Sequence, residues 1–119
     1  MFIKKLADCE EFTAGDGSQL RELLHPDKAD IAIKYSLAHA IVRPGQITTL
    51  HSLKTSEVYY IVKGEGIMHI NEESSKVHPG AAIYIPAGSR QYIHNSGKTD
   101  LVFLCIVDPA WRGEDEEII

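Results

Sequence analysis

The stretch GQITTLHSLKTSEVYYIVKG, residues 45–64, decides the fold together with GAAIYIPAGSRQYIHN, residues 80–95. Both stretches are rich in β-branched and aromatic residues, and glycine or proline punctuates them where the chain must turn. Side chains alternate between the two faces of a strand, so His51 and Leu53 share a face, as do Gln91 and Asn95. The two stretches therefore predict short strands that aim a few polar groups into one place.

The rest of the chain continues as short apolar runs between turn residues. We expect seven strands, at residues 34–42, 46–53, 57–62, 66–71, 81–86, 91–95 and 101–107, with EESSK (72–76) as a polar turn. Short strands at regular spacing are typical of an all-β sandwich or barrel. The one helical signal is QLRELL (19–24), which predicts a helical turn stopped by Pro26. Several strands are apolar on both faces, which predicts a second layer or a partner chain.

Composition narrows the class of protein. The chain has 119 residues, so we expect one domain over residues 1–119 with its own core. The net charge of −5 argues against nucleic acid as a partner, and no apolar run approaches the roughly 18 residues of a membrane span. Cys9 and Cys105 fit no metal or disulfide pattern and predict reduced thiols in a cytoplasmic protein. The acidic tail from Gly113 to Glu117 is expected to fray, with Trp111 as an anchor.

Two spaced motifs give the chain a family resemblance. The first runs Gly45, five residues, His51, one residue, Leu53, three residues, Glu57, six residues and Gly64; the second joins Gly80, Pro86, Gly88, Gln91 and Asn95. This spacing resembles that of the small single-domain cupins, except at Leu53 and Gln91, where the family usually has histidine. The resemblance implies an all-β cupin jelly-roll, or double-stranded β-helix, barrel. It is specific for the fold and much less so for activity, because one fold hosts many chemistries.

The resemblance also implies a metal site. Carried over by residue, His51 and Glu57 match the cupin ligands, and Gln91 offers a weaker amide oxygen at the third position. We therefore predict a divalent ion (Zn, Ni, Mn or Fe) held by His51, Glu57 and Gln91. The alternative is that Gln91 only satisfies a buried neighbour by hydrogen bonding.

The remaining five histidines are less well placed for a metal. His39 or His69 would supply a further ligand if its side chain faced inward. His94 lies on the opposite face from Gln91, and His25 and His78 are expected at the surface beside prolines.

Three functions are compatible with these residues. The first is a metal-binding cupin that binds or converts a small organic molecule, carbohydrate or carboxylate-like, with the metal as Lewis acid; an isomerase would belong here. The second is a metal-free binding or sensor module. The third is a metal-dependent oxygenase, which requires a second histidine. A homodimer is the expected assembly, and no membrane partner is expected.

Overall fold

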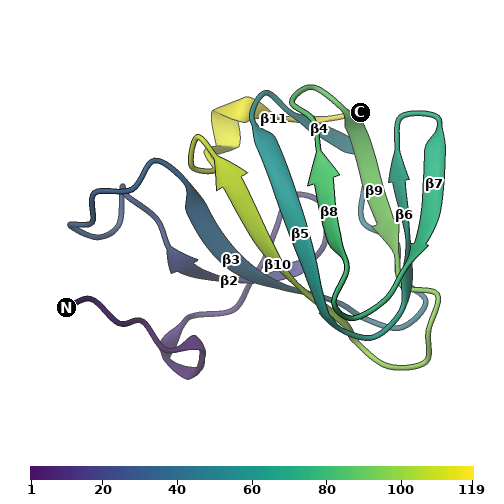
Figure 1. Ribbon diagram of the computed structural model, residues 1–119, viewed down its shortest axis with the longest axis horizontal. Coiled ribbons are helices and arrows are strands. Elements are labelled where there is room, and N and C mark those ends of the chain that lie inside the picture. Colours follow the sequence, from purple (N-terminus) through teal and green to yellow (C-terminus); the bar gives the residue numbers. More distant parts are fainter.

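The computed structural model describes residues 1–119 as two antiparallel sheets (Figure 1). The first sheet has the strand order β1 (Phe12–Thr13), β2 (Gln19–Leu24), β3 (Ser36–Val42), β10 (Leu101–Asp108), β5 (Ser56–Lys63) and β8 (Ala82–Ile85). The second has the order β11 (Glu116–Ile118), β4 (His51–Leu53), β9 (Arg90–His94), β6 (Gly66–Ile70) and β7 (Glu73–Val77). Two short 3-10 helices, η1 (Leu6–Asp8) and η2 (Gly113–Asp115), complete the chain. No helix is long and apolar enough to cross a membrane.

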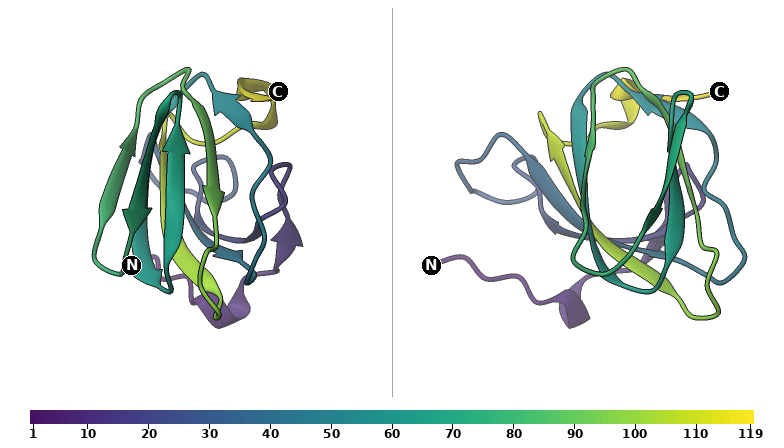
Figure 2. Two further views of the ribbon diagram at one scale, coloured as in Figure 1. Left: turned by 90° about the vertical axis from the view of Figure 1, so that its right-hand side faces the viewer. Right: turned by 45° about the vertical axis from the view of Figure 1, so that its right-hand side comes forward.

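The two sheets curve around a common interior, as the turned views in Figure 2 show. This arrangement confirms the prediction of an all-β jelly-roll barrel. The interior is filled by apolar side chains from both sheets, and the largest of those fully buried are Phe103, Ile61, Ile85, Ile93 and Leu101. Removing each such side chain from water contributes about 1.5–3 kcal/mol, which makes this interior the main source of stability.

Strand β10 shows how the two faces of the first sheet differ. Leu101, Phe103, Cys105 and Val107 are buried in the interior, while the residues between them face outward. The outer face of this sheet is also apolar, with Tyr60, Val62, Tyr84 and Ile106 exposed. One apolar face of these strands fills the interior, as predicted. The partner chain predicted for the other face stays a prediction, since that face is exposed in the single chain.

The predicted helical turn at residues 19–24 is wrong. These residues form β2, which pairs with β1 on one side and with β3 on the other. All its residues are partly buried. An isolated helical turn is costly to nucleate, and pairing with two neighbouring strands satisfies the backbone of this segment more fully.

Three other local predictions need correction. Of the polar turn expected at residues 72–76, residues 73–76 instead belong to β7, the edge strand that pairs with β6. Residues 46–50 are not regular strand, because only residues 51–53 of the expected 46–53 strand pair as β4. The acidic tail does not fray, since β11 pairs with β4 and closes one edge of the second sheet. Each correction comes from pairing with a partner distant in sequence.

Gly64 is required by a close approach of two backbones. It lies between β5 and β6 with a φ of +88°, a region that glycine enters at little cost. A Cβ atom at this position would lie 2.6 Å from the backbone oxygen of Asp100. The glycine of the first motif therefore fixes the path of the chain between the two sheets.

Candidate functional site

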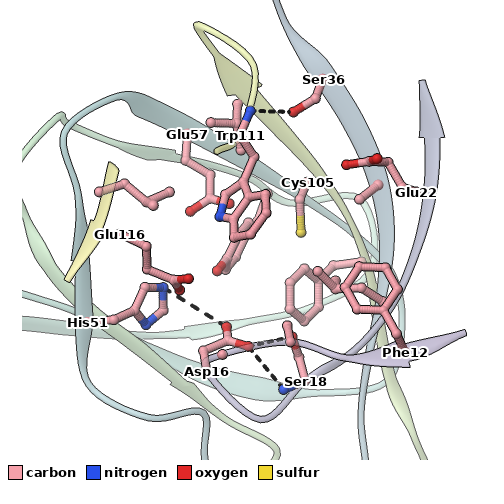
Figure 3. Close-up of a pocket in the computed structure, with 18 of the residues that line it drawn as sticks. Phe12, Asp16, Ser18, Glu22, Ser36, His51, Glu57, Cys105, Trp111 and Glu116 are labelled. Carbon is pink, nitrogen blue, oxygen red and sulfur yellow. Dashed lines mark hydrogen bonds and ion pairs between the residues drawn. The ribbon is translucent and has the colours of Figure 1, made fainter. Parts of the chain in front are cut away.

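A cavity of about 210 Å³ lies inside one end of the barrel. Its wall combines strands of both sheets with two segments that come from near the ends of the chain (Figure 3). His51 and Leu53 come from β4, Glu57 and Tyr59 from β5, and Cys105 from β10. Most of the wall is apolar, so the few polar groups determine what the cavity can recognise.

His51 presents one nitrogen to this cavity in a fixed tautomer. Its ring is buried, and Nδ1 lies 2.7 Å from the carbonyl oxygen of Thr49. A carbonyl only accepts hydrogen bonds, so Nδ1 carries the proton and Nε2 of the neutral ring is an acceptor. Nε2 lies 4.0 Å from Oδ2 of Asp16. The histidine therefore offers the cavity a lone pair beside a carboxylate.

Glu57 is the second polar group predicted from the motif, and it is buried with an unpaired oxygen. Its Oε1 has no hydrogen-bond partner. Burial raises the pKa of Glu57 from 4.5 to about 8; the Gln91 amide opposes this shift, and the charges of Asp16 and Glu116 add to it. A buried acid that lacks a partner is expensive, and such groups concentrate at binding sites.

Gln91 lies directly opposite His51 in the pairing of β4 with β9. Its side chain is buried, and its Oε1 accepts a hydrogen bond of 3.2 Å from the hydroxyl of Tyr59. The amide group therefore turns its oxygen to Tyr59 and its nitrogen toward Glu57, whose pKa it lowers. Gln91 thus makes hydrogen bonds to buried neighbours, as in the alternative to metal coordination. Tyr59 itself belongs both to the core and to the cavity wall, and burial holds its pKa well above the ordinary value.

The two histidines considered as further ligands face away from the cavity. In β3, Ala38 lines the cavity and Ala40 is in the core, so His39 between them points outward. In β6, Met68 is buried inside, and His69 stacks on Tyr92 with ring centroids 4.2 Å apart. Neither ring lines the cavity, so His51 is the one histidine there.

These residues do not form a metal shell as they stand. No group of three or more His, Cys, Asp or Glu side chains is arranged to hold a metal ion. Leu53, which shares the inward face with His51, brings an apolar side chain to a position where the cupin pattern has a ligand. The Gln91 oxygen is engaged by Tyr59. Metal binding by His51, Glu57 and Gln91 remains a prediction.

Sequence reasoning missed the acidic residues that complete the site. Asp16 comes from the turn before β2, where its Oδ1 accepts hydrogen bonds from the backbone N–H (3.0 Å) and hydroxyl (2.6 Å) of Ser18. Glu116 begins β11, opposite Leu53, and its side chain lies beside His51 in Figure 3. Partial burial raises the pKa of Glu116, and His51 opposes that shift. No local signal placed either acid near His51, because both arrive through contacts distant in sequence.

Trp111 lines the cavity and is held in place by a second cluster of side chains. His25, expected at the surface, is instead buried: its Nδ1 accepts the backbone N–H of Asp27, so its Nε2–H donates to the Trp111 carbonyl at 2.7 Å. Arg112 binds both oxygens of Asp27 at 2.9 Å. Ser36 accepts the N–H of Trp111. Trp111 therefore does anchor against the body, as predicted, and its ring lines the cavity.

The charged residues lining the cavity are unbalanced in sign. Four carboxylic acids contribute to the wall, namely Asp16, Glu22, Glu57 and Glu116, and no lysine or arginine does. Lys28 pairs with Glu22 from outside, and Arg112 is engaged with Asp27. Electrostatically, the cavity is an acidic one with apolar walls.

Sequence and structure comparisons agree with this architecture. The cupin-domain family profile matches residues 38–107, which span both motifs and both sheets. The chain belongs to the cupin family. An uncharacterized protein of Methanocaldococcus jannaschii is 45% identical to this cupin over 105 residues, which are 87% of this chain and 83% of that protein.

Two other cupin relatives carry more informative names. The oxalate-binding protein of Thermotoga maritima is 35% identical over 65 residues, 54% of each chain. The crystal structure of a predicted oxalate decarboxylase, also from Thermotoga maritima, matches with a TM-score of 0.78 and 25% identity. That match covers 91% of this chain and 99% of the other. The fold of that structure is thus shared along nearly the whole chain.

Proposed function

We propose that this cupin binds a small organic molecule in the cavity, held by hydrogen bonds to His51 and Glu57. The observation that carries the proposal is the buried Oε1 of Glu57, which has no hydrogen-bond partner in the protein. The Glu57 side chain lines the same cavity as the His51 ring. Leaving such an atom unpaired costs about 1–3 kcal/mol, which a ligand that donates a hydrogen bond would recover.

The groups in the wall favour some ligands over others. A carbohydrate or another hydroxyl compound can donate to Glu57 and His51 and lay its carbon skeleton on the apolar wall. A carboxylate-like ligand such as oxalate would instead meet acids and no lysine or arginine. The oxalate named for the Thermotoga maritima relative would therefore require a cation at this site.

A metal-binding version is the second candidate. It is favoured by the hydrogen bond from His51 Nδ1 to the Thr49 carbonyl, because histidines that ligate metals usually have their other nitrogen fixed in this way. A divalent ion on His51 and Glu57, with Gln91 turned to present its oxygen, would act as a Lewis acid. The oxygenase alternative needs a second histidine in the cavity wall, and His51 is the only histidine there.

Ligand binding can be followed through the protein's own fluorescence. Trp111 is the only tryptophan in the chain and lines the cavity, so its emission reports on occupancy. We expect saturable quenching or enhancement with at least one member of a set of small polyols, carboxylic acids, alcohols and amines, abolished in Ala38→Phe, which fills the cavity. A flat response to the whole set, or binding that persists unchanged in Ala38→Phe, would overturn the proposal.

Metal content separates the two candidates. Protein purified without a metal-affinity tag is analysed for bound metal as wild type and as His51→Ala, before and after incubation with Zn²⁺, Ni²⁺, Mn²⁺ or Fe²⁺. One equivalent in the wild type that His51→Ala loses supports the metal-binding version. Wild type that stays below a tenth of an equivalent after incubation rules that version out.

A further inference from the structure

The inner end of the cavity contains acceptors that no group of the protein satisfies. Oδ1 of Asp16 is occupied by Ser18, which leaves Oδ2 toward the His51 ring at a distance beyond a hydrogen bond. Oε1 of Glu57, a residue that is 6% exposed, has no hydrogen-bond partner. Nε2 of His51 is the third acceptor. In Figure 3 the labelled side chains of Asp16, His51 and Glu116 converge on one side of the cavity. A cationic donor would pair with the Asp16 carboxylate and the His51 nitrogen, and it would favour the ionised form of the Glu57 acid.

Two of these acceptors lie close enough to share one ligand group. His51 Nε2 and Asp16 Oδ2 are 4.0 Å apart, and neither atom has a hydrogen-bond partner in the protein. An ammonium group carries three N–H donors on one nitrogen, so it can pair with several acceptors at once. These two atoms therefore suit a ligand group that brings more than one donor.

The rest of the wall suits the body of an organic cation. Tyr59, Phe103, Phe12 and Trp111 bring aromatic rings to the cavity, and ring faces attract cations as well as apolar groups. The wall contains no lysine or arginine that would repel a cation. An ammonium group would therefore find acceptors at one end and an aromatic wall around the carbon skeleton attached to it.

We propose that the cavity selects a primary amine, whose ammonium group lies among His51, Asp16 and Glu57 and whose apolar body packs on the aromatic wall. This inference rests on the proposed function, because it names the chemical class that the same cavity takes. Asp16, which lies outside both cupin motifs, is then the residue that makes the cavity prefer a positively charged head group to a neutral or negative one.

Three compounds with the same ring and different head groups test this inference. Benzylamine, benzyl alcohol and benzoate are titrated at pH 7 into chelator-treated protein, with Trp111 fluorescence and calorimetry as readouts. We expect benzylamine to bind about tenfold or more tightly than benzyl alcohol, since hydrogen bonds to charged groups are about twice as strong as neutral ones, and benzoate not to bind. Asp16→Asn should bring the affinity for benzylamine close to the affinity for benzyl alcohol. Glu73→Gln removes one carboxylate charge from an exposed position on β7, so it should change neither the affinity for benzylamine nor the affinity for benzyl alcohol.

The outcomes separate this inference from the function on which it rests. Benzyl alcohol or benzoate binding as tightly as benzylamine overturns the amine site and leaves small-molecule binding in place. An amine preference that survives Asp16→Asn intact also overturns the role of Asp16. No binding by the three probes or by the wider compound set overturns both the proposed function and this inference.

Discussion

Replacing Glu57 by glutamine should change how the stability of the protein depends on pH. Burial raises the pKa of Glu57 from 4.5 to about 8, so between these values the folded protein keeps a proton that the unfolded chain has lost. The folded state then binds more protons than the unfolded state, and stability falls as pH rises through this window. Below pH 4.5 both states are protonated, and above pH 8 both are ionised, so the slope vanishes on either side.

The expected magnitude follows from the shift. Each pH unit inside the window costs about 1.4 kcal/mol, so from pH 5 to pH 8 the wild type should lose about 4 kcal/mol of unfolding free energy through this one group. Glutamine has nearly the same shape and does not ionise. The unfolding free energy of Glu57→Gln minus that of the wild type should therefore rise by about 4 kcal/mol across the same range.

Urea unfolding of both proteins at half-unit steps from pH 4 to pH 9 measures this difference. Chelator is present throughout, because a bound cation would favour the ionised carboxylate. Contributions of the other acids and of the six histidines cancel in the difference. Exposed Glu73→Gln serves as the control and should give a flat difference. A flat difference for Glu57→Gln as well would refute the reasoning, because it would mean that Glu57 titrates alike in the folded and unfolded states.

Three further predictions concern the frame around the site. His25→Ala leaves the Trp111 carbonyl without its donor, so it should cost about 1–3 kcal/mol in urea unfolding and redshift Trp111 emission; an unchanged emission maximum would show that His25 does not hold the ring. Gly64→Ala forces a Cβ to within 2.6 Å of the Asp100 oxygen at positive φ and should lower the melting temperature by several degrees or prevent folding, whereas Gly45→Ala, with open space around its Cβ and a φ of +78°, should cost only about 1 kcal/mol; equal losses would contradict the close-approach argument. The exposed apolar face with Tyr60, Val62, Tyr84 and Ile106 should make the protein a homodimer by light scattering at micromolar concentration, and Tyr84→Glu should yield monomer; a monomeric wild type would refute this.

The strands and the first two site residues could be predicted from the sequence because they depend on local rules. Strand alternation places His51 and Leu53 on one face, and both are buried in the structure. The spacing of the two motifs places Gln91 beside His51, and the register of β4 with β9 pairs them directly. Glycines at turns mark where strands end, as Gly64 does after β5.

Local rules failed where a strand has no preferred face. SLAHAIV in β3 is apolar at both parities, so nothing in its pattern says whether His39 or its neighbours face the interior. IMHI in β6 is similar, and the position of Met68 in the core turns His69 outward. Residues 19–24 carry a helical pattern that two neighbouring strands override. In each case the choice depends on which surface packs against the segment.

Strand alternation and turn residues act within a few residues of each other, so the sequence alone predicts an all-β chain of short strands. The resemblance to the cupins adds the barrel and the inward position of His51 and Glu57. The chemical character of the site depends on tertiary contacts. These contacts bring Asp16 from the N-terminal turn to 4.0 Å from His51 and turn the oxygen of Gln91 to Tyr59. They also bring Glu116 and Trp111 from the C-terminal segment into the wall of the same cavity. The physical reason is that the charge and the walls of a cavity are set by side chains that meet across sheets, and such meetings are fixed by packing and strand pairing.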